Sequence, residues 1–391
     1  MDNFLIKNKI LKTVKNLIKK KSKKLHEPIF EGNEKKYLIK CIDSGYVSYK
    51  GEFVNKFERK ISNYTNSKFA IATMNGTSSL HLLLKIFKID SKHEVILPSI
   101  SFVAAANSII YCNAMPNFVD SEINTLGIDP VKLRNYLLRN TKIKNKTCIN
   151  KKTGKIIKVV IAVHVLGIPC QIIKLKKVCK EFNLILIEDA AGAIGSFYKK
   201  KHLGLFGDAG IISFNGNKTI TCGGGGVILT NNKKIASSAK HLSTTAKVKN
   251  TWEYIHDEVG YNYRMTNVNA AIGYAQLMNI SNILKSKRKN YLAYKNKLGN
   301  EKLFTVFDEP EQSKSNYWLV TLLLKKPNAK LRNEIINHLH KNGYEARPIW
   351  KPIHKLSMFK KSPKDNLSMT EKIYNSVINL PSSPALNYRK I

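Results

Sequence analysis

Long apolar runs are missing from this sequence of 391 residues. No stretch approaches the roughly 20 apolar residues that a membrane-spanning helix needs. The first 25 residues also lack the uninterrupted apolar core of a signal peptide, because lysines recur every few positions. We therefore expect a cytoplasmic protein without a transmembrane segment.

Paired cysteines are missing as well. The six cysteines form no CxxC pair and show no spacing typical of a metal site. Thiols of this kind stay reduced and idle in a reducing compartment. We expect no disulfide framework and no bound metal.

Acidic residues are few, with 27 Asp and Glu against 66 Lys and Arg, and the net charge is +39. Such a balance is compatible with a protein that binds a polyanion or, through its basic N-terminus, a membrane surface without being an enzyme. The lysines, however, are spread along the whole chain together with many Asn and Ile residues, as in the products of AT-rich genomes. No aromatic-rich RNA motif or recognition-helix pattern accompanies them. We expect no nucleic-acid partner, and the non-enzymatic reading stays as the alternative of a different class.

Hydrophobic residues make up 43% of the chain, enough for a large core and more than one domain. Residues 1–26 form a basic segment whose apolar positions follow helical spacing, which predicts a surface helix. In residues 27–280, short Ile, Val and Leu runs alternate with helical stretches, which predicts an α/β domain around a mostly parallel, buried sheet. The expected strands are 68–73, 94–100, 116–120, 158–165, 184–191, 209–214 and 226–230.

The pattern of apolar and polar residues changes near residue 281. A long basic helix over 281–298 is followed by an expected strand at 316–324, a helix at 328–343 and a strand at 344–350. This order predicts a smaller α+β domain over residues 281–391.

The stretch SFNGNKTITCGGGG, residues 213–226, combines Lys218 with a run of four glycines. A nucleoside triphosphate site of the Walker type requires glycine directly before the lysine and further glycines upstream. Here Asn217 precedes Lys218 and the glycines follow it, so that interpretation fails. The remaining one is a lysine that forms a Schiff base with an aldehyde.

A pyridoxal phosphate site needs such a lysine, an acid for the pyridine nitrogen and donors for the phosphate. Asp189 ends the apolar run LILIED, at the strand end where α/β folds place ligands. Taken alone, it is better explained as a helix cap. Phe102, just after another strand, could stack on a flat ring or simply pack in the core.

Donors for a phosphate are found in the segment ATMNGTSSLHLLL. Gly76, Thr77 and Ser78 lie between an expected strand and helix, where free N–H groups and hydroxyls suit an anion. An ordinary helix cap explains them equally well. Ser213, five residues before Lys218, could add a further hydroxyl.

The motifs NGTSS, SISFVAAAN, EDAAGAIGS, GDAGIISFNGNK and GYNYRMTNVNAA follow one another in an order that resembles the DegT/DnrJ/EryC1/StrS family of sugar aminotransferases. The resemblance runs from about residue 27 to the C-terminus. It implies a fold-type I pyridoxal phosphate-dependent transferase. Further segments, such as RPIWKPIH, resemble the subgroup that makes 4-amino-4,6-dideoxy-N-acetylhexosamine nucleotides in legionaminic acid and bacillosamine pathways.

The resemblance implies roles for individual residues. Lys218 corresponds to the Schiff-base lysine, and Asn262, in GYNYR, to an asparagine that reaches the phosphate of the neighbouring subunit's cofactor. This implies a homodimer with shared sites. The other positions match the pyridine-nitrogen partner (Asp189), the stacking aromatic (Phe102) and the phosphate cradle (Gly76, Thr77, Ser78 and Ser213). The glycine run lets the chain pass close behind the lysine.

One position departs from the family pattern. Gly192 stands where the family often has Gln, His or Glu, so a contact is lost there or supplied by another group such as His164. Arg347, Lys351 and His354 are candidates for the nucleotide diphosphate, although solvated charges explain them equally well.

Relatives with histidine in place of the lysine are dehydratases, so Lys218 favours amino transfer. The implied reaction moves an amino group from glutamate to C4 of a UDP- or GDP-linked 4-keto-6-deoxy-N-acetylhexosamine, for bacterial surface glycan or nonulosonic acid synthesis. Amination at C3 of a sugar nucleotide is the alternative within the family.

Overall fold

The computed structural model of the protein describes residues 3–18, 23–248, 250, 252–299 and 301–386. Its central feature is a sheet with the strand order β1-β11-β10-β7-β6-β2-β3. The strands are β1 (Phe69–Thr73), β2 (His93–Pro98), β3 (Met115–Val119), β6 (Ile156–Val163), β7 (Ile185–Asp189), β10 (Ala209–Ser213) and β11 (Gly226–Thr230), with the hairpin β4 (Thr141–Lys144) and β5 (Thr147–Asn150) beside β6.

Every strand expected for this sheet is present, and the sheet is mostly parallel. Strands β3, β2, β6, β7 and β10 run parallel to their neighbours, whereas β11 is antiparallel to both β10 and β1. Along β6, Val159 and Ile161 enter one core cluster while Val160 and Ala162 enter the other. This alternation buries both faces of the sheet.

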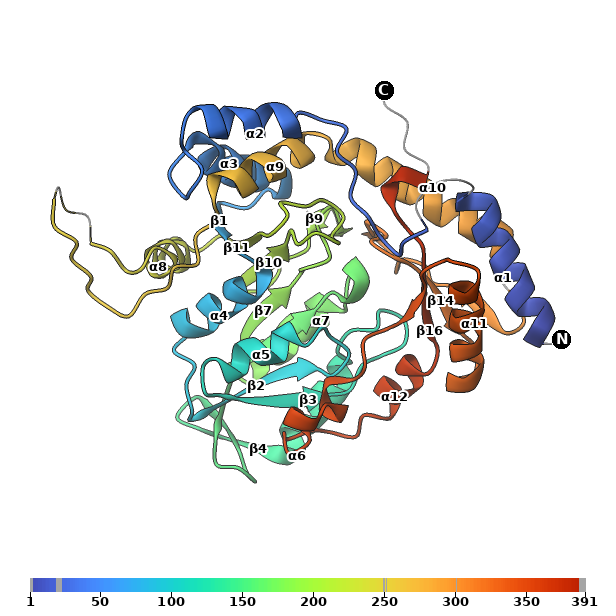
Figure 1. The fold of residues 1–391 in the computed structure, drawn as a ribbon. Coiled ribbons are helices and arrows are strands. Elements are labelled where there is room, and N and C mark those ends of the chain that lie inside the picture. The colour runs from blue at the N-terminus through green and yellow to red at the C-terminus, as the bar shows by residue number, and fades with distance from the viewer. Residues whose placement is uncertain (1–2, 19–22, 249, 251, 300, 387–391) are drawn as a thin grey trace.

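Helices cover the two faces. One face packs against α2 (Glu34–Asp43), α3 (Glu52–Thr65), α6 (Pro130–Asn140), α7 (Ile172–Glu181) and α9 (Asn267–Met278). The other packs against α4 (Gly76–Ile86), α5 (Ala104–Ile110) and α8 (Lys233–Ser243), as Figure 1 shows. Several of these helices begin at a side-chain cap, for example Asn75 before α4 and Asp129 before α6.

The C-terminal region forms a second, antiparallel sheet. Its strand order is β12 (Phe304–Val306), β14 (Val320–Leu324), β16 (Val377–Leu380) and β15 (Arg347–Pro348). The helices α10 (Ile280–Leu298), α11 (Ala329–Lys341) and α12 (Ser368–Tyr374) accompany it. A third small sheet joins β13 (Ser313–Lys314) to β8 (Phe197–Tyr198) and β9 (Lys201–His202), and short 3₁₀ turns lie at Val165–Gly167, Ile353–Lys355, Ser357–Phe359 and Pro384–Leu386.

In the C-terminal region, two expected strands are shorter than the sequence suggests. The strand expected over 344–350 pairs only at Arg347–Pro348, where proline lacks the N–H group that would continue the ladder. The strand expected over 316–324 begins at Val320, because the backbone N–H groups of Asn316 and Trp318 donate to the Ser196 hydroxyl and to Asn316 Oδ1 and not to a neighbouring strand.

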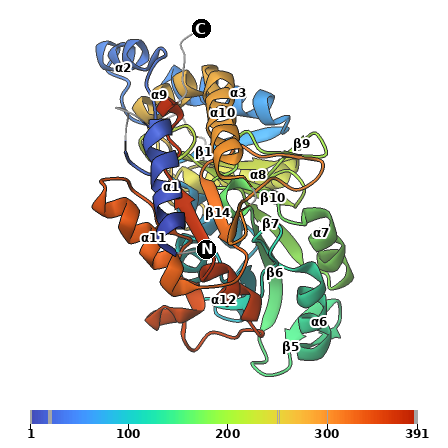
Figure 2. The same ribbon diagram turned by 90° about the vertical axis from the view of Figure 1, so that its right-hand side faces the viewer.

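Helix α1 (Asn3–Ile18) confirms the expected amphipathic surface helix. Ile6, Ile10, Val14 and Ile18 are buried in the core cluster of the second sheet, which also contains Tyr294 of α10. Figures 1 and 2 show α1 lying along α10 and α11. The boundaries expected at residues 26/27 and 280/281 stay predictions.

The segment from Thr244 to Asn262 projects from the body of the molecule (Figure 1). A bridge between these two residues closes its base. Three large apolar side chains on it are mostly exposed: Trp252 (82%), Tyr254 (80%) and Val259 (84%). Apolar exposure of this extent is typical of a surface that another chain covers.

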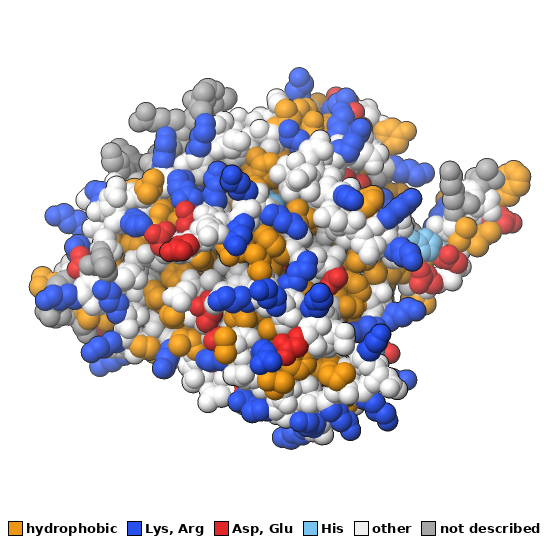
Figure 3. All heavy atoms as spheres, turned by 180° about the vertical axis from the view of Figure 1, so that it is seen from behind, with side chains coloured by type: hydrophobic (Ala, Val, Ile, Leu, Met, Phe, Trp, Pro, Cys, Tyr) orange, Lys and Arg blue, Asp and Glu red, His pale blue; other side chains and the backbone are white. Residues whose placement is uncertain are grey.

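Basic side chains show no single concentration on the face drawn in Figure 3. Lys and Arg are spread over that whole face, with Asp and Glu between them. Within the described ranges, no helix combines the length and apolar character that crossing a membrane requires.

Candidate active site

A cavity of about 360 Å³ opens where the parallel strands of the large sheet end. Its walls include residues that end or directly follow β6, β7 and β10, and others shortly after the end of β2, the position where open α/β sheets bind ligands. Seven residues singled out from the sequence line it: Gly76, Thr77, Phe102, His164, Asp189, Ser213 and Lys218.

Lys218 and Asp189 influence each other within this cavity. Burial lowers the pKa of Lys218 from its ordinary value to about 8, and the charge of Asp189 opposes that shift. Burial raises the pKa of Asp189, against the effects of the Ala191 N–H group and Lys218. One oxygen of Asp189 accepts the Ala191 N–H at 3.0 Å, and the side chain borders the cavity. The pair thus offers an amine that loses its proton easily beside a carboxylate.

The N-terminus of α4 also lines the cavity. Asn75 caps this helix by accepting hydrogen bonds from the N–H of Ser78 at 2.8 Å and from its hydroxyl at 2.7 Å. Ser78 therefore points into the cap and does not line the cavity, whereas Gly76 and Thr77 do. A helix N-terminus of this kind favours an anion.

The last glycine of the run, Gly226, lies against this same turn. A Cβ atom on Gly226 would lie 2.4 Å from the carbonyl carbon of Asn75. Ser213 is also close, since a Cβ on Gly76 would meet the Ser213 Cβ at 3.1 Å. Gly226 therefore allows β11 to pass behind the start of α4.

Three aromatic side chains form the remaining wall. Phe102 is 58% exposed, and its ring centre lies 6.4 Å from that of Trp350. Trp350 in turn lies 6.4 Å from Trp318. Sequence reasoning found Phe102 but missed both tryptophans, which stood in segments interpreted only as strands, NYWLVTLLL and YEARPIW.

His164 borders the cavity, but both of its ring nitrogens have protein partners. Nε2 lies 2.9 Å from Glu188 Oε2, and Nδ1 accepts the Cys170 N–H at 3.2 Å. The side chain therefore offers the cavity a ring edge and no free nitrogen.

The other candidates lie outside the cavity lining. His354 contacts Ser99 at 2.8 Å and Glu371 at 3.1 Å. Arg347 and Lys351, which precede and follow Trp350 in the sequence, are exposed. Asn262 is exposed at the base of the projecting segment, where its Oδ1 accepts two hydrogen bonds from Arg264.

Comparison with known proteins gives the family. The DegT/DnrJ/EryC1/StrS aminotransferase family matches residues 28–391. The chain belongs to this family. The predicted resemblance is therefore confirmed, and the protein is a pyridoxal phosphate-dependent sugar aminotransferase.

Individual relatives agree with the family assignment. The chain is 38% identical to a GDP-perosamine synthase of Vibrio cholerae over 93% of this chain and 94% of the relative. It is 28% identical to a UDP-4-amino-4,6-dideoxy-N-acetyl-β-L-altrosamine transaminase of Campylobacter jejuni, covering 87% of each. The solved structure of Helicobacter pylori PseC, an aminotransferase of pseudoaminic acid biosynthesis, superposes with a TM-score of 0.81 at 25% identity over 91% of this chain and 92% of that one. The predicted fold-type I class is confirmed.

The residues present fit pyridoxal phosphate. The cavity has the size of a small-molecule site. It places an amine of lowered pKa beside a buried carboxylate, and it faces the N-terminus of α4. These are the groups that an aldehyde, a pyridine nitrogen and a phosphate require.

Proposed function

We propose that this sugar aminotransferase moves an amino group from glutamate to C4 of a nucleotide-linked 4-keto-6-deoxy sugar. The observation that carries the proposal is the meeting of Lys218, Asp189 and the N-terminus of α4 around one cavity. The amine, the carboxylate and the anion-binding helix end come from three separate parts of the chain.

Lys218 and Asp189 have complementary roles. When bound, pyridoxal phosphate supplies an electron sink for the negative charge that develops at the amino donor's α-carbon. Lys218 holds the cofactor and then moves the α-proton as a general base. A pKa of about 8 leaves roughly a tenth of the amine neutral at pH 7, enough for a base that works near neutrality. Asp189 keeps the pyridine nitrogen protonated.

The rest of the cavity wall orients the cofactor. The N–H groups of Gly76 and Thr77, with the hydroxyl of Ser213, are candidates for the phosphate. Ser78 contributes by holding Asn75 in its capping position. Phe102, largely exposed at the rim, has a free face for stacking on a flat ring.

Relatives favour a GDP sugar as the acceptor. The name of the 38% identical Vibrio cholerae relative gives GDP-perosamine as its product, which corresponds to amination at C4. The Campylobacter jejuni relative, at 28% identity, acts on a UDP-linked N-acetyl sugar. We therefore rank a GDP-linked 4-keto-6-deoxyhexose first and the UDP-linked N-acetyl sugar of legionaminic acid or bacillosamine routes second.

The nucleotide would approach the exposed side of the aromatic wall. Arg347 and Lys351 are near Trp350 in the sequence and both are exposed, so they are candidates for the diphosphate. His354, held by Ser99 and Glu371, is better suited to fixing the loop that carries Lys351.

The proposal includes a homodimer with shared sites. Asn262 is exposed and lies beside a projecting segment with unburied Trp252 and Tyr254. If a second copy covers this segment, Asn262 of the first copy would reach the phosphate of the cofactor that the second copy binds. A cytoplasmic location and a place in surface glycan synthesis complete the proposal, and the free thiols of all six cysteines agree with a reducing compartment.

The test combines glutamate and a panel of 4-keto sugar nucleotides with the purified protein, read by mass spectrometry, with NMR to place the new amine. We expect the GDP-linked C4 product from the wild type. Lys218→Ala should keep its fold by circular dichroism but lose both turnover and the borohydride-sensitive absorbance of the lysine-bound cofactor. Wild-type turnover by Lys218→Ala would end the proposal, and an amine at C3 would redirect it.

A further inference from the structure

The indole of Trp318 contacts Lys218 directly. The Nζ atom of Lys218 lies 3.9 Å from the centre of a Trp318 ring, within the range of a cation–π interaction. The indole N–H donates to the carbonyl oxygen of Asn217 at 2.8 Å, so the edge of the same ring system holds the residue before the lysine. Trp318 thus touches both the amine and the backbone that carries it.

Asn316 fixes the backbone of Trp318. Its Oδ1 accepts the Trp318 N–H at 2.9 Å, while its Nδ2 donates to the carbonyl oxygens of Gly192 at 2.8 Å and Ile194 at 2.9 Å. From the other side, Lys287 donates to the Trp318 carbonyl oxygen at 2.7 Å. The indole is therefore positioned by contacts with the segment after β7 and with α10.

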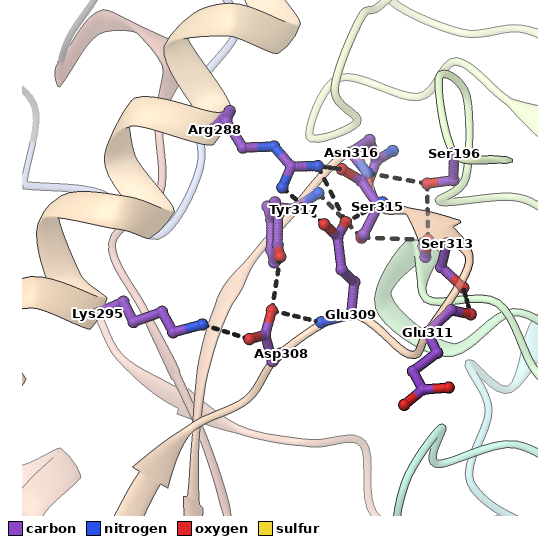
Figure 4. A network of polar contacts seen from close by, with 11 residues as sticks. Ser196, Arg288, Lys295, Asp308, Glu309, Glu311, Ser313, Ser315, Asn316 and Tyr317 are labelled. Atoms are coloured by element: carbon purple, nitrogen blue, oxygen red, sulfur yellow. Dashed lines mark hydrogen bonds and ion pairs between the residues drawn. The ribbon is translucent and has the colours of Figure 1, made fainter. Parts of the chain in front are cut away.

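The segment that leads to Trp318 is itself fixed (Figure 4). Arg288 makes two hydrogen bonds to Glu309, at 2.7 and 2.9 Å, and Glu309 accepts the Ser315 N–H at 2.6 Å. The Asn316 N–H donates to the Ser196 hydroxyl at 3.0 Å. A bidentate Arg–carboxylate pair of this kind holds geometry well.

Gly192 leaves the space that the indole occupies. A Cβ atom on Gly192 would lie 2.7 Å from Cε3 and 3.1 Å from Cζ3 of Trp318. Real Cβ atoms essentially never approach a carbon so closely, and this indole cannot swing away without losing its bonds. The position of the Trp318 indole therefore depends on residue 192 being a glycine.

We propose that Trp318 is a positioning residue for the Lys218 amine, and that residue 192 is glycine because the indole needs its space. The inference rests on the proposed role of Lys218 as the cofactor lysine. A long, flexible lysine must keep its amine at one place whenever that amine is not bonded to the cofactor. The indole face supplies that place and favours the ammonium form, while Asp189 adds its charge.

The first test needs no activity. The rate at which an amine-selective reagent labels Lys218 is measured against pH in the cofactor-free protein, by peptide mass spectrometry. Trp318→Leu removes the aromatic face, so more of the amine is neutral and labelling at pH 7 should rise about three- to tenfold. Trp318→Phe retains a face and should stay near the wild type. Unchanged or slower labelling in Trp318→Leu would overturn the inference.

The second test examines the coupling with Gly192. Gly192→Ala should displace the indole and change labelling in the same direction as Trp318→Leu. In the double variant, the alanine should add nothing, because the indole it displaces is already absent. Independent, multiplicative effects of the two substitutions would show that they do not act through each other.

A matched control separates positioning from stability. Phe304→Leu truncates a buried aromatic residue in the second sheet, outside the cavity lining. It should lower the melting temperature but leave Lys218 labelling unchanged. If Trp318→Leu does not fold, Trp318→Phe and Gly192→Ala decide the question by the same measurement.

The cofactor-loaded enzyme provides a further readout. In the glutamate half-reaction, Trp318→Leu should lower the rate constant more than the affinity for glutamate, and Trp318→Phe should restore most of the rate. If Lys218→Ala abolishes turnover while the Trp318 and Gly192 variants behave as the wild type, only this inference fails. If Lys218→Ala remains active, the proposed function fails with it.

Discussion

Nε2 of His164 lies 2.9 Å from Oε2 of Glu188, and both side chains are fully buried. Because His164 Nδ1 accepts the Cys170 N–H, the ring carries its proton on Nε2 and donates it to the carboxylate. Glu188 also accepts the N–H groups of Gly204 at 2.8 Å and Gly207 at 2.7 Å. Burial alone would raise the pKa of Glu188, but His164 and these backbone donors lower it overall.

Glu188→Gln should destabilise the protein. The amide replaces a carboxylate surrounded by donors and leaves several of them without an acceptor, so we expect a loss of about 3–5 kcal/mol in unfolding free energy. Urea denaturation measures it. Glu52→Gln, at an exposed pair with Lys40 and Lys56, is the control and should cost at most about 1 kcal/mol. Equal losses in the two variants would contradict the role given to Glu188.

The lowered pKa of Glu188 also makes the free energy of unfolding depend on pH. A carboxyl group whose pKa is lower in the folded state contributes stability above its unfolded pKa, and this contribution is lost as pH falls through the folded value. The difference between wild type and Glu188→Gln should therefore shrink in acid.

The neighbouring acids Glu188 and Asp189 show what sequence could and could not supply. Strand alternation places their side chains on opposite faces of β7, and the carboxylate at the strand end, Asp189, borders the cavity. The partners of Glu188 could not be predicted, because they come from a loop some twenty residues later and from the end of β6. Only the folded sheet brings those segments together.

The same limit applies to the aromatic wall. Phe102 comes shortly after the large-sheet strand β2, which ends at Pro98, so its place near the cavity could be inferred locally. Trp318 and Trp350 reach the cavity from segments next to strands of the second sheet, and the packing of those segments against the large sheet leaves no local pattern in sequence. The antiparallel direction of β11 was missed for a related reason, since a buried apolar run has the same composition in either direction.

Lys218 should titrate near pH 8 in the cofactor-free protein. Burial lowers its pKa from the ordinary 10.5 to about 8, and Asp189 holds it from falling further. Asp189→Asn removes that charge and should move the midpoint of Lys218 labelling to lower pH. A midpoint that stays fixed would mean that the two groups do not interact.

The lowered pKa of Lys218 also makes the free energy of unfolding depend on pH. The folded protein binds fewer protons than the unfolded chain between about pH 8 and 10.5, so stability rises with pH across that window. Lys218→Met should lack this rise, which urea denaturation at several pH values would reveal.

Gly226→Ala should be destabilising. The added Cβ would lie 2.4 Å from the carbonyl carbon of Asn75, and backbone atoms on both sides leave no cheap adjustment. We expect a loss of about 1–3 kcal/mol in unfolding free energy, together with weaker retention of cofactor phosphate at the displaced start of α4. Gly224→Ala is the matched control, since its Cβ would have its nearest neighbour at 3.7 Å. Similar stability of the two variants would contradict the close approach of β11 to α4.

The shared-site dimer makes the last prediction. Asn262 lies outside the cavity lining of its own chain and is exposed, as a residue that serves a neighbouring site would be. In a mixed dimer of one Lys218→Ala chain and one Asn262→Ala chain, shared sites would place both lesions in one site and neither in the other. The intact site should then give about half of wild-type dimer activity, as complementation at symmetric shared sites requires.

Co-expression with two different tags isolates this mixed dimer for assay. If Asn262 instead served its own chain, every site would carry one lesion, and activity would not exceed that of the better single-variant homodimer. That result, or sedimentation as a monomer at working concentration, would overturn the shared-site arrangement. Exposed Trp252 and Tyr254 on the projecting segment supply a second check, because replacing both with serine should weaken the dimer. The rate of Lys218 labelling in the separated variant chains should stay the same as in the wild type.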